Sequence, residues 1–322
     1  ASPIEFKPSS GNIKTKLWSY LEAMTPIDIP KSLGIIGSGA IGIEFACFYN
    51  ALGAKVKVYE MQKKILPNED GEVSELLKKT LSNRGIEFEL ATKVLDISEK
   101  KLFELTSEEI HTSKKETNNF EKVLVATGVK GNTSNLGLEN TKIKIKNDQI
   151  VTYLNGSTDE SNIYAIGDVA GTPWLAHKAS HEGIKCVEHI TGSIKDKDNN
   201  IHIPSCVYSN PQVASIGLTE NKAKKLGINI KVGKFPLSAN GKALSLDEPE
   251  GFVKTIFEAN TGQILGAHLI GAEVTELINT FALAIRLEAT ELDIFSTIFP
   301  HPTISETIHE SSLDAFGKAI HI

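Results

Sequence analysis

Hydrophobic and polar positions along the first third of the chain predict strands and helices in alternation. Residues 31–36, KSLGII, form a short apolar run of the kind that a buried strand shows. A glycine-rich turn follows, and IEFACFYNALGA (43–54) then carries apolar residues at helical spacing. A second strand over 55–60, a helix over 72–84 and a third strand over 86–90 continue the pattern. This order predicts a parallel sheet covered by helices.

The pattern changes in the middle of the chain. Residues 91–122 indicate antiparallel strands with a polar, Lys/Glu/Asn-rich hairpin near 107–119. KVLVATG (122–128) and NIYAIGDVAG (162–171) each indicate an apolar strand that ends in glycine. A helix is expected over 176–190.

The polar segment SIKDKDNNIH at 193–202 marks an expected boundary. Beyond it, apolar runs such as YSNPQVASIGL (208–218) and a helical TELINTFALAIRLEA (275–289) follow one another. The last part of the chain is therefore expected to be an α+β domain.

Composition and charge limit the class of protein. The chain has 322 residues, of which 40% are hydrophobic and 23% charged, as in a globular protein of about two or three domains. A net charge of −6 argues against sequence-independent binding to nucleic acid or to an anionic membrane. The three cysteines are irregularly spaced and indicate neither a disulfide framework nor a metal site. Small molecules or proteins are the expected partners, and no signal segment or membrane span is expected.

The turn GSGAIG lies between the first predicted strand and its helix. Gly37 would allow the tight turn, Gly39 would let a pyrophosphate approach the backbone, and Gly42 would let helix and strand pack closely. Glu60 ends the next strand. Its separation in sequence from Gly37 is close to the interval expected for a carboxylate that binds the ribose of NAD and repels a 2′-phosphate. The alternative is a structural joint of helix and strand with Glu60 in solvent.

FPHPTISETIHE, residues 299–310, is open to two interpretations. Thr303 and Glu306 have the spacing of a capping box at the start of a helix. In the functional interpretation, Glu306 fixes one imidazole nitrogen of His301, and the other nitrogen accepts a thiol proton. The local sequence allows both.

Several of these segments occur together in the flavin-dependent disulfide reductases. GSGAIGIEF, ATG, IYAIGDVAGTPWLAHKASHEG, YSNPQVASIGLTE, ILGAHLIG and FPHPTISE stand here in that family's order. The sequence resembles this family through essentially its whole length, and within it most closely the members that oxidise dihydrolipoamide. The resemblance favours catalysis by His301 and Glu306.

The resemblance implies an α/β fold with a Rossmann-like, doubly wound NAD-binding domain, the remainder of an FAD or central domain, and an α+β interface domain for dimerisation. The corresponding segments are 1–30 for the tail of the FAD domain and a connecting helix, 31–129 for the NAD-binding domain, 130–200 for the central remainder and 201–322 for the interface domain.

The resemblance also implies roles for single residues. The NAD site would comprise Gly37, Gly39, Ala40, Ile41, Gly42 and Glu60, with Glu44 near the contact between nicotinamide and flavin. The FAD site would include Gly128, Asp168, Ala176 and His177. For Asp168 the alternative is a cap on the following helix, and for His177 an exposed helix position. Cys47, Cys186 and Cys206 are expected to be buried small residues.

The implied protein is a homodimer that passes electrons from a dithiol through a cysteine pair and FAD to NAD. Its implied partner is the lipoyl-bearing acyltransferase of a 2-oxo acid dehydrogenase complex, in the cytoplasm or, in a eukaryote, the mitochondrial matrix. The family's FAD glycine fingerprint and CxxxxC pair belong upstream of residue 1, so the chain is expected to be a portion of a longer protein. The alternatives are a glutathione or mercuric reductase, or a non-catalytic NAD-binding dimerisation module.

Overall fold

The computed structural model describes residues 1–9, 13–193 and 202–321. The chain divides into two compact units. The smaller unit comprises Ala1–Phe6 with Thr127–Ile201, and the larger comprises Lys7–Ala126 with His202–Ile322. The larger unit thus holds both the predicted nucleotide sheet and the C-terminal domain. The boundary expected at 193–202 lies almost wholly outside the described residues.

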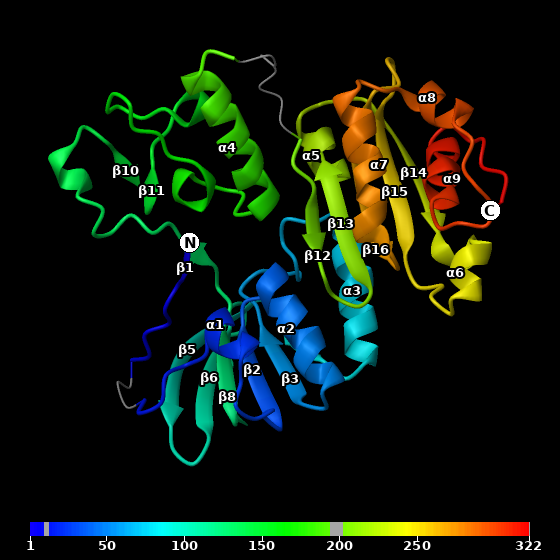
Figure 1. Cartoon of the computed structure of the whole chain (residues 1–322). Helices are drawn as coiled ribbons and strands as arrows, with labels where there is room; N and C mark the ends of the chain where they lie inside the picture. The colour runs from blue at the N-terminus through cyan, green and yellow to red at the C-terminus, as the bar shows by residue number, and fades with distance from the viewer. Residues whose placement is uncertain (10–12, 194–201, 322) are drawn as a thin grey trace. The chain divides into compact units, whose positions relative to one another are not determined.

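The first half of the larger unit contains the predicted parallel sheet (Figure 1). Its strand order is β4-β3-β2-β8, and every neighbouring pair is parallel. The strands are β2 (Ser32–Ile36), β3 (Lys55–Tyr59), β4 (Glu87–Glu89) and β8 (Lys122–Val125). The alternation of strand and helix in the sequence is confirmed.

Two helices pack against this sheet and bury their apolar faces. They are α2 (Ala40–Ala51) and α3 (Gly71–Asn83), preceded in the chain by the short α1 (Tyr20–Met24). Tyr49 on α2 is fully buried, and its hydroxyl donates a hydrogen bond of 2.6 Å to the carbonyl of Ala23. The polar group of this large core side chain is thereby satisfied, as burial requires.

Three antiparallel strands form a second, smaller sheet in the same half. They are β5 (Thr92–Glu99), β6 (Phe103–Glu109) and β7 (Lys115–Phe120), and they pair in that order. The polar hairpin predicted near 107–119 is confirmed as the connection from β6 to β7.

The second half of the larger unit is a five-stranded antiparallel sheet in the order β12-β13-β16-β15-β14, with helices packed on it. Phe281 on α7 is fully buried in the core that this packing creates. The α+β expectation is confirmed. The strands are β12 (Ser205–Val207), β13 (Gln212–Gly217), β14 (Ile230–Pro236), β15 (Phe252–Glu258) and β16 (Ile264–Gly271); the helices are α5 (Glu220–Lys225), α6 (Gly241–Ser245), α7 (Val274–Arg286), α8 (Glu291–Ser296) and α9 (Glu306–Asp314).

The smaller unit has little sheet structure. Its strands are the pairs β1 (Ser2–Pro3) with β9 (Val129–Lys130) and β10 (Ile145–Lys146) with β11 (Gln149–Ile150), and its long helix is α4 (Ala176–Ile190) as predicted.

The strand expected within 162–171 is wrong for the described residues. Tyr164 makes a single bridge to Ser157, and a 3₁₀ turn, η3 (Gly167–Ala170), follows. An apolar run becomes a strand only where a neighbouring strand satisfies its backbone groups, and within the described residues this run has no such neighbour.

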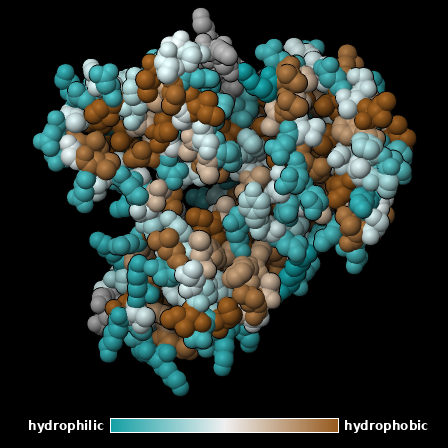
Figure 2. All heavy atoms as spheres, in the orientation of Figure 1, coloured by the Kyte–Doolittle hydropathy of each residue, from teal (hydrophilic) through white to brown (hydrophobic). Residues whose placement is uncertain are grey.

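The surface of the molecule mixes hydrophobic and hydrophilic side chains. Figure 2 shows hydrophobic side chains over the part of the molecule that contains α4. Ile184, Val187 and Ile190 of this helix are between 57% and 60% exposed. Within the described ranges, no helix is both long and apolar enough to cross a membrane.

Candidate functional site

The glycine turn between β2 and α2 has the geometry that a dinucleotide requires. Gly37 has a φ of 102°, in the left-handed region, and its amide donates a hydrogen bond of 2.8 Å to the carbonyl of Tyr59. A Cβ added at Gly42 would lie 2.0 Å from the carbonyl oxygen of Gly37, so helix and turn approach too closely for any side chain. At Gly39 an added Cβ would find no atom of the described structure within 4 Å.

The open space at Gly39 lies at the start of α2. Gly39 is the residue that caps this helix, and Ala40 and Ile41 form its first turn. Because first-turn amides lack partners within their own helix, they bind phosphate groups well, and the helix dipole adds to this. The turn therefore fits the pyrophosphate of a nicotinamide dinucleotide.

Glu60 lies directly after β3 and its carboxylate is tied to the turn. Oε2 accepts hydrogen bonds from the amide and the hydroxyl of Ser38, at 2.9 and 2.8 Å, and Oε1 accepts one from the amide of Gln62 at 2.8 Å. The carboxylate is therefore held beside the turn and is not a loose strand end. Ser38, which is fully buried, was not singled out from the sequence.

Glu44 lies in the second turn of α2 and contacts the C-terminal half of the unit. Its Oε1 accepts a hydrogen bond of 2.9 Å from the amide of Tyr208. Burial raises the pKa of this carboxyl, and the bond from Tyr208 opposes the shift. The contact fixes Glu44 at the interface between the two halves of the larger unit.

The residues expected at FAD belong to the smaller unit. Gly128 has a φ of 132°, and its carbonyl accepts a hydrogen bond of 3.1 Å from the amide of Ile4. Asp168 lies in η3, where its Oδ2 is 3.1 Å from the amino nitrogen of Ala1. Ala176 and His177 are exposed in the first turn of α4.

Asp168 lies upstream of α4 and is not the residue at the start of that helix. The residue that caps α4 is Leu175, and its side chain makes no hydrogen bond at the cap. The Asp168 carbonyl accepts a bond of 3.2 Å from the indole of Trp174. The carboxylate, bonded through Oδ2 to the amino group of Ala1, is 38% exposed. A partly exposed carboxylate accepts hydrogen bonds from hydroxyl groups, which fits the ribityl chain of a flavin.

His301 and Glu306 form a pair at the start of α9. The imidazole Nδ1 lies 3.0 Å from Oε1 and 3.2 Å from Oε2 of Glu306. Burial opposes ionisation of Glu306, but the Thr303 amide and His301 outweigh burial and lower the pKa of its carboxyl. An ionised Glu306 accepts the Nδ1–H, so the second nitrogen of a neutral imidazole keeps its lone pair. The imidazole is 78% exposed, and that nitrogen is accessible.

The capping-box interpretation of this segment is only half correct. Glu306 Oε2 accepts a hydrogen bond of 2.9 Å from the Thr303 amide, as a capping box requires. The Thr303 hydroxyl, however, donates to the carbonyl of Pro300 at 2.7 Å, and the residue at the cap is Ser305. One carboxylate thus holds both a backbone amide and the imidazole.

The cysteines of the chain are free thiols. Burial raises the pKa of Cys47 and of Cys206, which disfavours their thiolates. Cys186 is buried.

The larger unit brings together the glycine turn, Glu60 and Glu44, and it also carries His301 with Glu306.

A second set of charged residues in this unit was not predicted from the sequence. Lys254 is 2% exposed and contacts Asp70 at 3.2 Å, between the two halves of the unit. A lysine inside the apolar run FVKTIFE was the available signal.

Comparison with known proteins identifies the class. Residues 7–183 match the family described as "Pyridine nucleotide-disulphide oxidoreductase", and residues 203–312 match its dimerisation domain. The chain belongs to the pyridine nucleotide-disulphide oxidoreductase family. FAD and NAD are the cofactors that this membership implies.

Three relatives within the family are named dihydrolipoyl dehydrogenase. A dihydrolipoyl dehydrogenase of Rhizobium etli is 48% identical over 308 residues, which cover 95% of this chain and 64% of the relative. That of Bacillus subtilis is 44% identical, with 93% of this chain and 64% of the relative covered. A mitochondrial dihydrolipoyl dehydrogenase of Pisum sativum is 37% identical, with 95% and 62% covered. The chain is therefore similar to dihydrolipoyl dehydrogenases and spans less than two thirds of their length.

Solved structures have the same fold. An HOCl-induced flavoprotein disulfide reductase, RclA, from Escherichia coli superposes with a TM-score of 0.87 at 25% sequence identity. The match covers 97% of this chain and 71% of that one. The predicted fold class is confirmed.

Proposed function

We propose that this chain is the NAD-binding and dimerisation portion of a dihydrolipoyl dehydrogenase, which oxidises protein-bound dihydrolipoamide and reduces NAD. The observation that carries the proposal is the pair of His301 and Glu306, with one imidazole nitrogen held by an ionised carboxylate and the other accessible. A thiol must lose its proton before its sulfur attacks a disulfide, so this reaction needs a base of this kind.

Each group of residues has a role in the proposed reaction. Glu306 orients the imidazole of His301, whose second nitrogen takes the proton from the substrate thiol. The turn at Gly39 binds the pyrophosphate of NAD, and Glu60 binds its ribose. Bound FAD would supply the two-electron step between the dithiol and NAD, with Asp168 as one of its protein contacts.

The proposal includes partners and a compartment. The protein acts as a homodimer through its C-terminal domain, and the lipoyl-bearing acyltransferase of a 2-oxo acid dehydrogenase complex presents the substrate. It works in the cytoplasm, or in the mitochondrial matrix of a eukaryote. The family's dimerisation domain and the names of the relatives support these statements.

Titration of the chain with nicotinamide dinucleotides tests the cofactor preference. We expect NADH to bind more tightly than NADPH, because the carboxylate of Glu60 attracts ribose hydroxyls and repels a 2′-phosphate. Isothermal titration calorimetry measures both affinities. Equal or tighter binding of NADPH would contradict this assignment of Glu60.

An activity assay of the intact protein separates the proposal from other members of the family. Dihydrolipoamide with NAD should give turnover, whereas glutathione disulfide with NADPH should not. Turnover of only the second pair would assign the protein to the glutathione-type reductases. Tight NADH binding without either activity would favour a non-catalytic module.

A further inference from the structure

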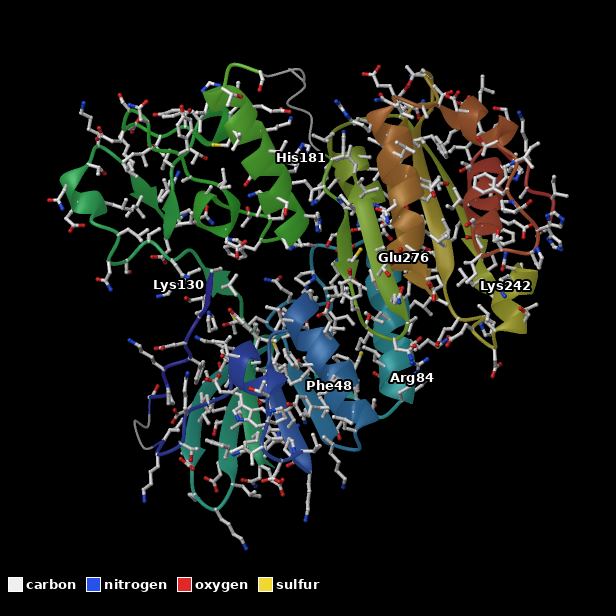
Figure 3. The ribbon with its side chains drawn as sticks, in the orientation of Figure 1. Phe48, Arg84, Lys130, His181, Lys242 and Glu276 are labelled. Carbon is white, nitrogen blue, oxygen red and sulfur yellow. The ribbon has the colours of Figure 1, made fainter. Side chains whose placement is uncertain are left out.

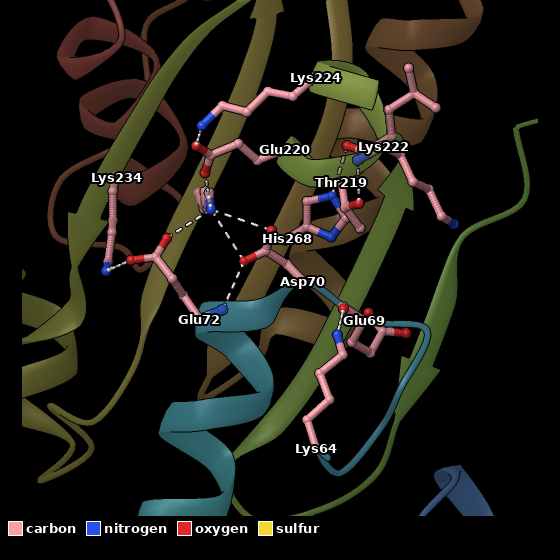
Figure 4. Close-up of polar contacts among 12 residues, drawn as sticks. Lys64, Glu69, Asp70, Glu72, Thr219, Glu220, Lys222, Lys224, Lys234 and His268 are labelled. Carbon is pink, nitrogen blue, oxygen red and sulfur yellow. Dashed lines mark hydrogen bonds and ion pairs between the residues drawn. The ribbon is translucent and has the colours of Figure 1, made fainter. Parts of the chain in front are cut away.

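Lys254 is the most deeply buried charged side chain of a polar cluster in the larger unit. Figure 4 labels its carboxylate partners Asp70, Glu72 and Glu220. It lies on β15, is 2% exposed, and its ammonium group contacts three carboxylates. The contacts are to Asp70 Oδ1 at 3.2 Å, Glu72 Oε2 at 2.7 Å and Glu220 Oε2 at 2.6 Å. A buried charge with this many partners is held in one position. Its removal takes the described ion pair from the buried Asp70, whereas Glu72 keeps Lys234 and Glu220 keeps Lys224.

Two of these carboxylates belong to the start of α3, in the half of the unit that carries the glycine turn. Asp70 is 3% exposed and caps α3 by accepting a hydrogen bond of 3.1 Å from the amide of Glu72. Glu72 also contacts Lys234 of β14 at 2.6 Å. Lysines of the C-terminal sheet therefore hold the first turn of α3, which belongs to the other half of the unit.

Hydrogen bonds through Leu66 connect the start of α3 to the glycine turn. The hydroxyl of Ser74 on α3 donates a hydrogen bond of 3.3 Å to the carbonyl of Leu66. The amide of Leu66 donates one of 2.9 Å to the carbonyl of Ser38, inside the glycine turn. Ser38 then donates from both its amide and its hydroxyl to Glu60.

Leu66 has a backbone conformation that needs this support. Its φ is 43°, in the left-handed region, where a leucine side chain is disfavoured. Such a conformation persists only where the surrounding contacts enforce it. The Leu66 carbonyl accepts hydrogen bonds from Ser74 and from the amide of Glu69 at 2.9 Å, its amide donates to Ser38, and the residue is 3% exposed.

We propose that Lys254 is a positioning residue for the dinucleotide site: from the C-terminal sheet it fixes the start of α3, and through Leu66 it holds the glycine turn and Glu60 in place. This inference rests on the proposed NAD site. It gives the C-terminal domain a role in nucleotide binding in addition to dimerisation.

Replacement of Lys254 by methionine tests the proposal in two independent ways. Hydrogen exchange of the Leu66 and Ser38 amides, measured without any ligand, should become about tenfold faster or more, because their local opening is no longer opposed by the anchored helix. The dissociation constant for NADH should rise by a similar factor. Hydrogen exchange reports on the turn even if the wild-type chain proves not to bind NADH, so failure of the proposed function and failure of this inference are distinguishable.

Arg84 offers a matched control at the opposite end of α3 (Figure 3). Its guanidinium donates to the carbonyl of Asn210 at 2.8 Å and contacts Glu250 at 3.3 Å, so it also joins the two halves of the unit. Arg84→Met should leave exchange at Leu66 and Ser38 unchanged. Equal acceleration in Lys254→Met and Arg84→Met would show a general loosening of the two halves and would overturn the proposal.

Asp70→Asn is a milder variant for the case in which Lys254→Met does not fold. Asparagine keeps a helix-capping oxygen but removes one charge that holds Lys254. We expect the same acceleration at Leu66 and Ser38, to a smaller extent. Unchanged exchange at both amides in Asp70→Asn would contradict the proposal.

Discussion

Replacement of His301 by glutamine is expected to lower kcat for dihydrolipoamide oxidation by roughly 100- to 10,000-fold in the intact protein, the range that a positioned general base contributes. Glutamine can still donate a hydrogen bond to Glu306, but it has no basic nitrogen to accept the thiol proton. NADH affinity should not change, because His301 lies before α9 and the glycine turn lies between β2 and α2. Steady-state kinetics with a parallel NADH titration measure both quantities.

His321 supplies a matched control for this variant. Its Nδ1 lies 2.8 Å from Oε1 of Glu310, so it forms the same kind of pair with a carboxylate of the same helix, and its side chain is 68% exposed. The amides of Ile320 and His321 also donate to Glu310, at 3.0 and 3.2 Å, so this pair holds the segment after α9 against that helix. His321→Gln should keep kcat near the wild-type value. An equal loss of kcat in both variants would remove the case for His301 as the base.

The elements around the glycine turn could be predicted because their signals are local. Strand β2, the turn and helix α2 follow one another within residues 32–51, and the structure places them as expected. Hydrophobic periodicity and glycine spacing report on neighbours in sequence, which are here also neighbours in space. The predicted helix over 72–84 likewise appears as Gly71–Asn83.

Contacts between distant segments could not be predicted in this way. Lys254 and Asp70 are 184 positions apart, and the sequence around either residue does not predict that the other will be its partner. The expected strand within 162–171 failed for a related reason, since a strand depends on a partner that its own residues do not specify. Thr303 shows the same limit at short range, because its hydroxyl bonds to Pro300 instead of capping the helix.

Alanine at Gly39 and at Gly42 should separate ligand binding from folding. At Gly42 the added Cβ would lie 2.0 Å from a backbone oxygen, so α2 must move, and we expect a loss of about 1–3 kcal/mol or more in the free energy of unfolding. At Gly39 the added Cβ meets no described atom within 4 Å and φ is −68°. Alanine is a poorer helix cap than glycine but loses less chain entropy on folding, so the free energy of unfolding should change by less than about 1 kcal/mol. Urea denaturation measures both effects.

In Gly39→Ala, NADH affinity should respond differently from stability. Gly39→Ala places a methyl group where the pyrophosphate approaches, and we expect NADH binding to weaken by roughly tenfold or more, since such an overlap costs about 1–3 kcal/mol. Gly241→Ala, at the start of α6, adds the same methyl group to open space away from the turn and should change neither quantity. If Gly39→Ala bound NADH as tightly as Gly241→Ala does, the open space at Gly39 would not be a phosphate site, and the turn would be only the joint of a strand and a helix.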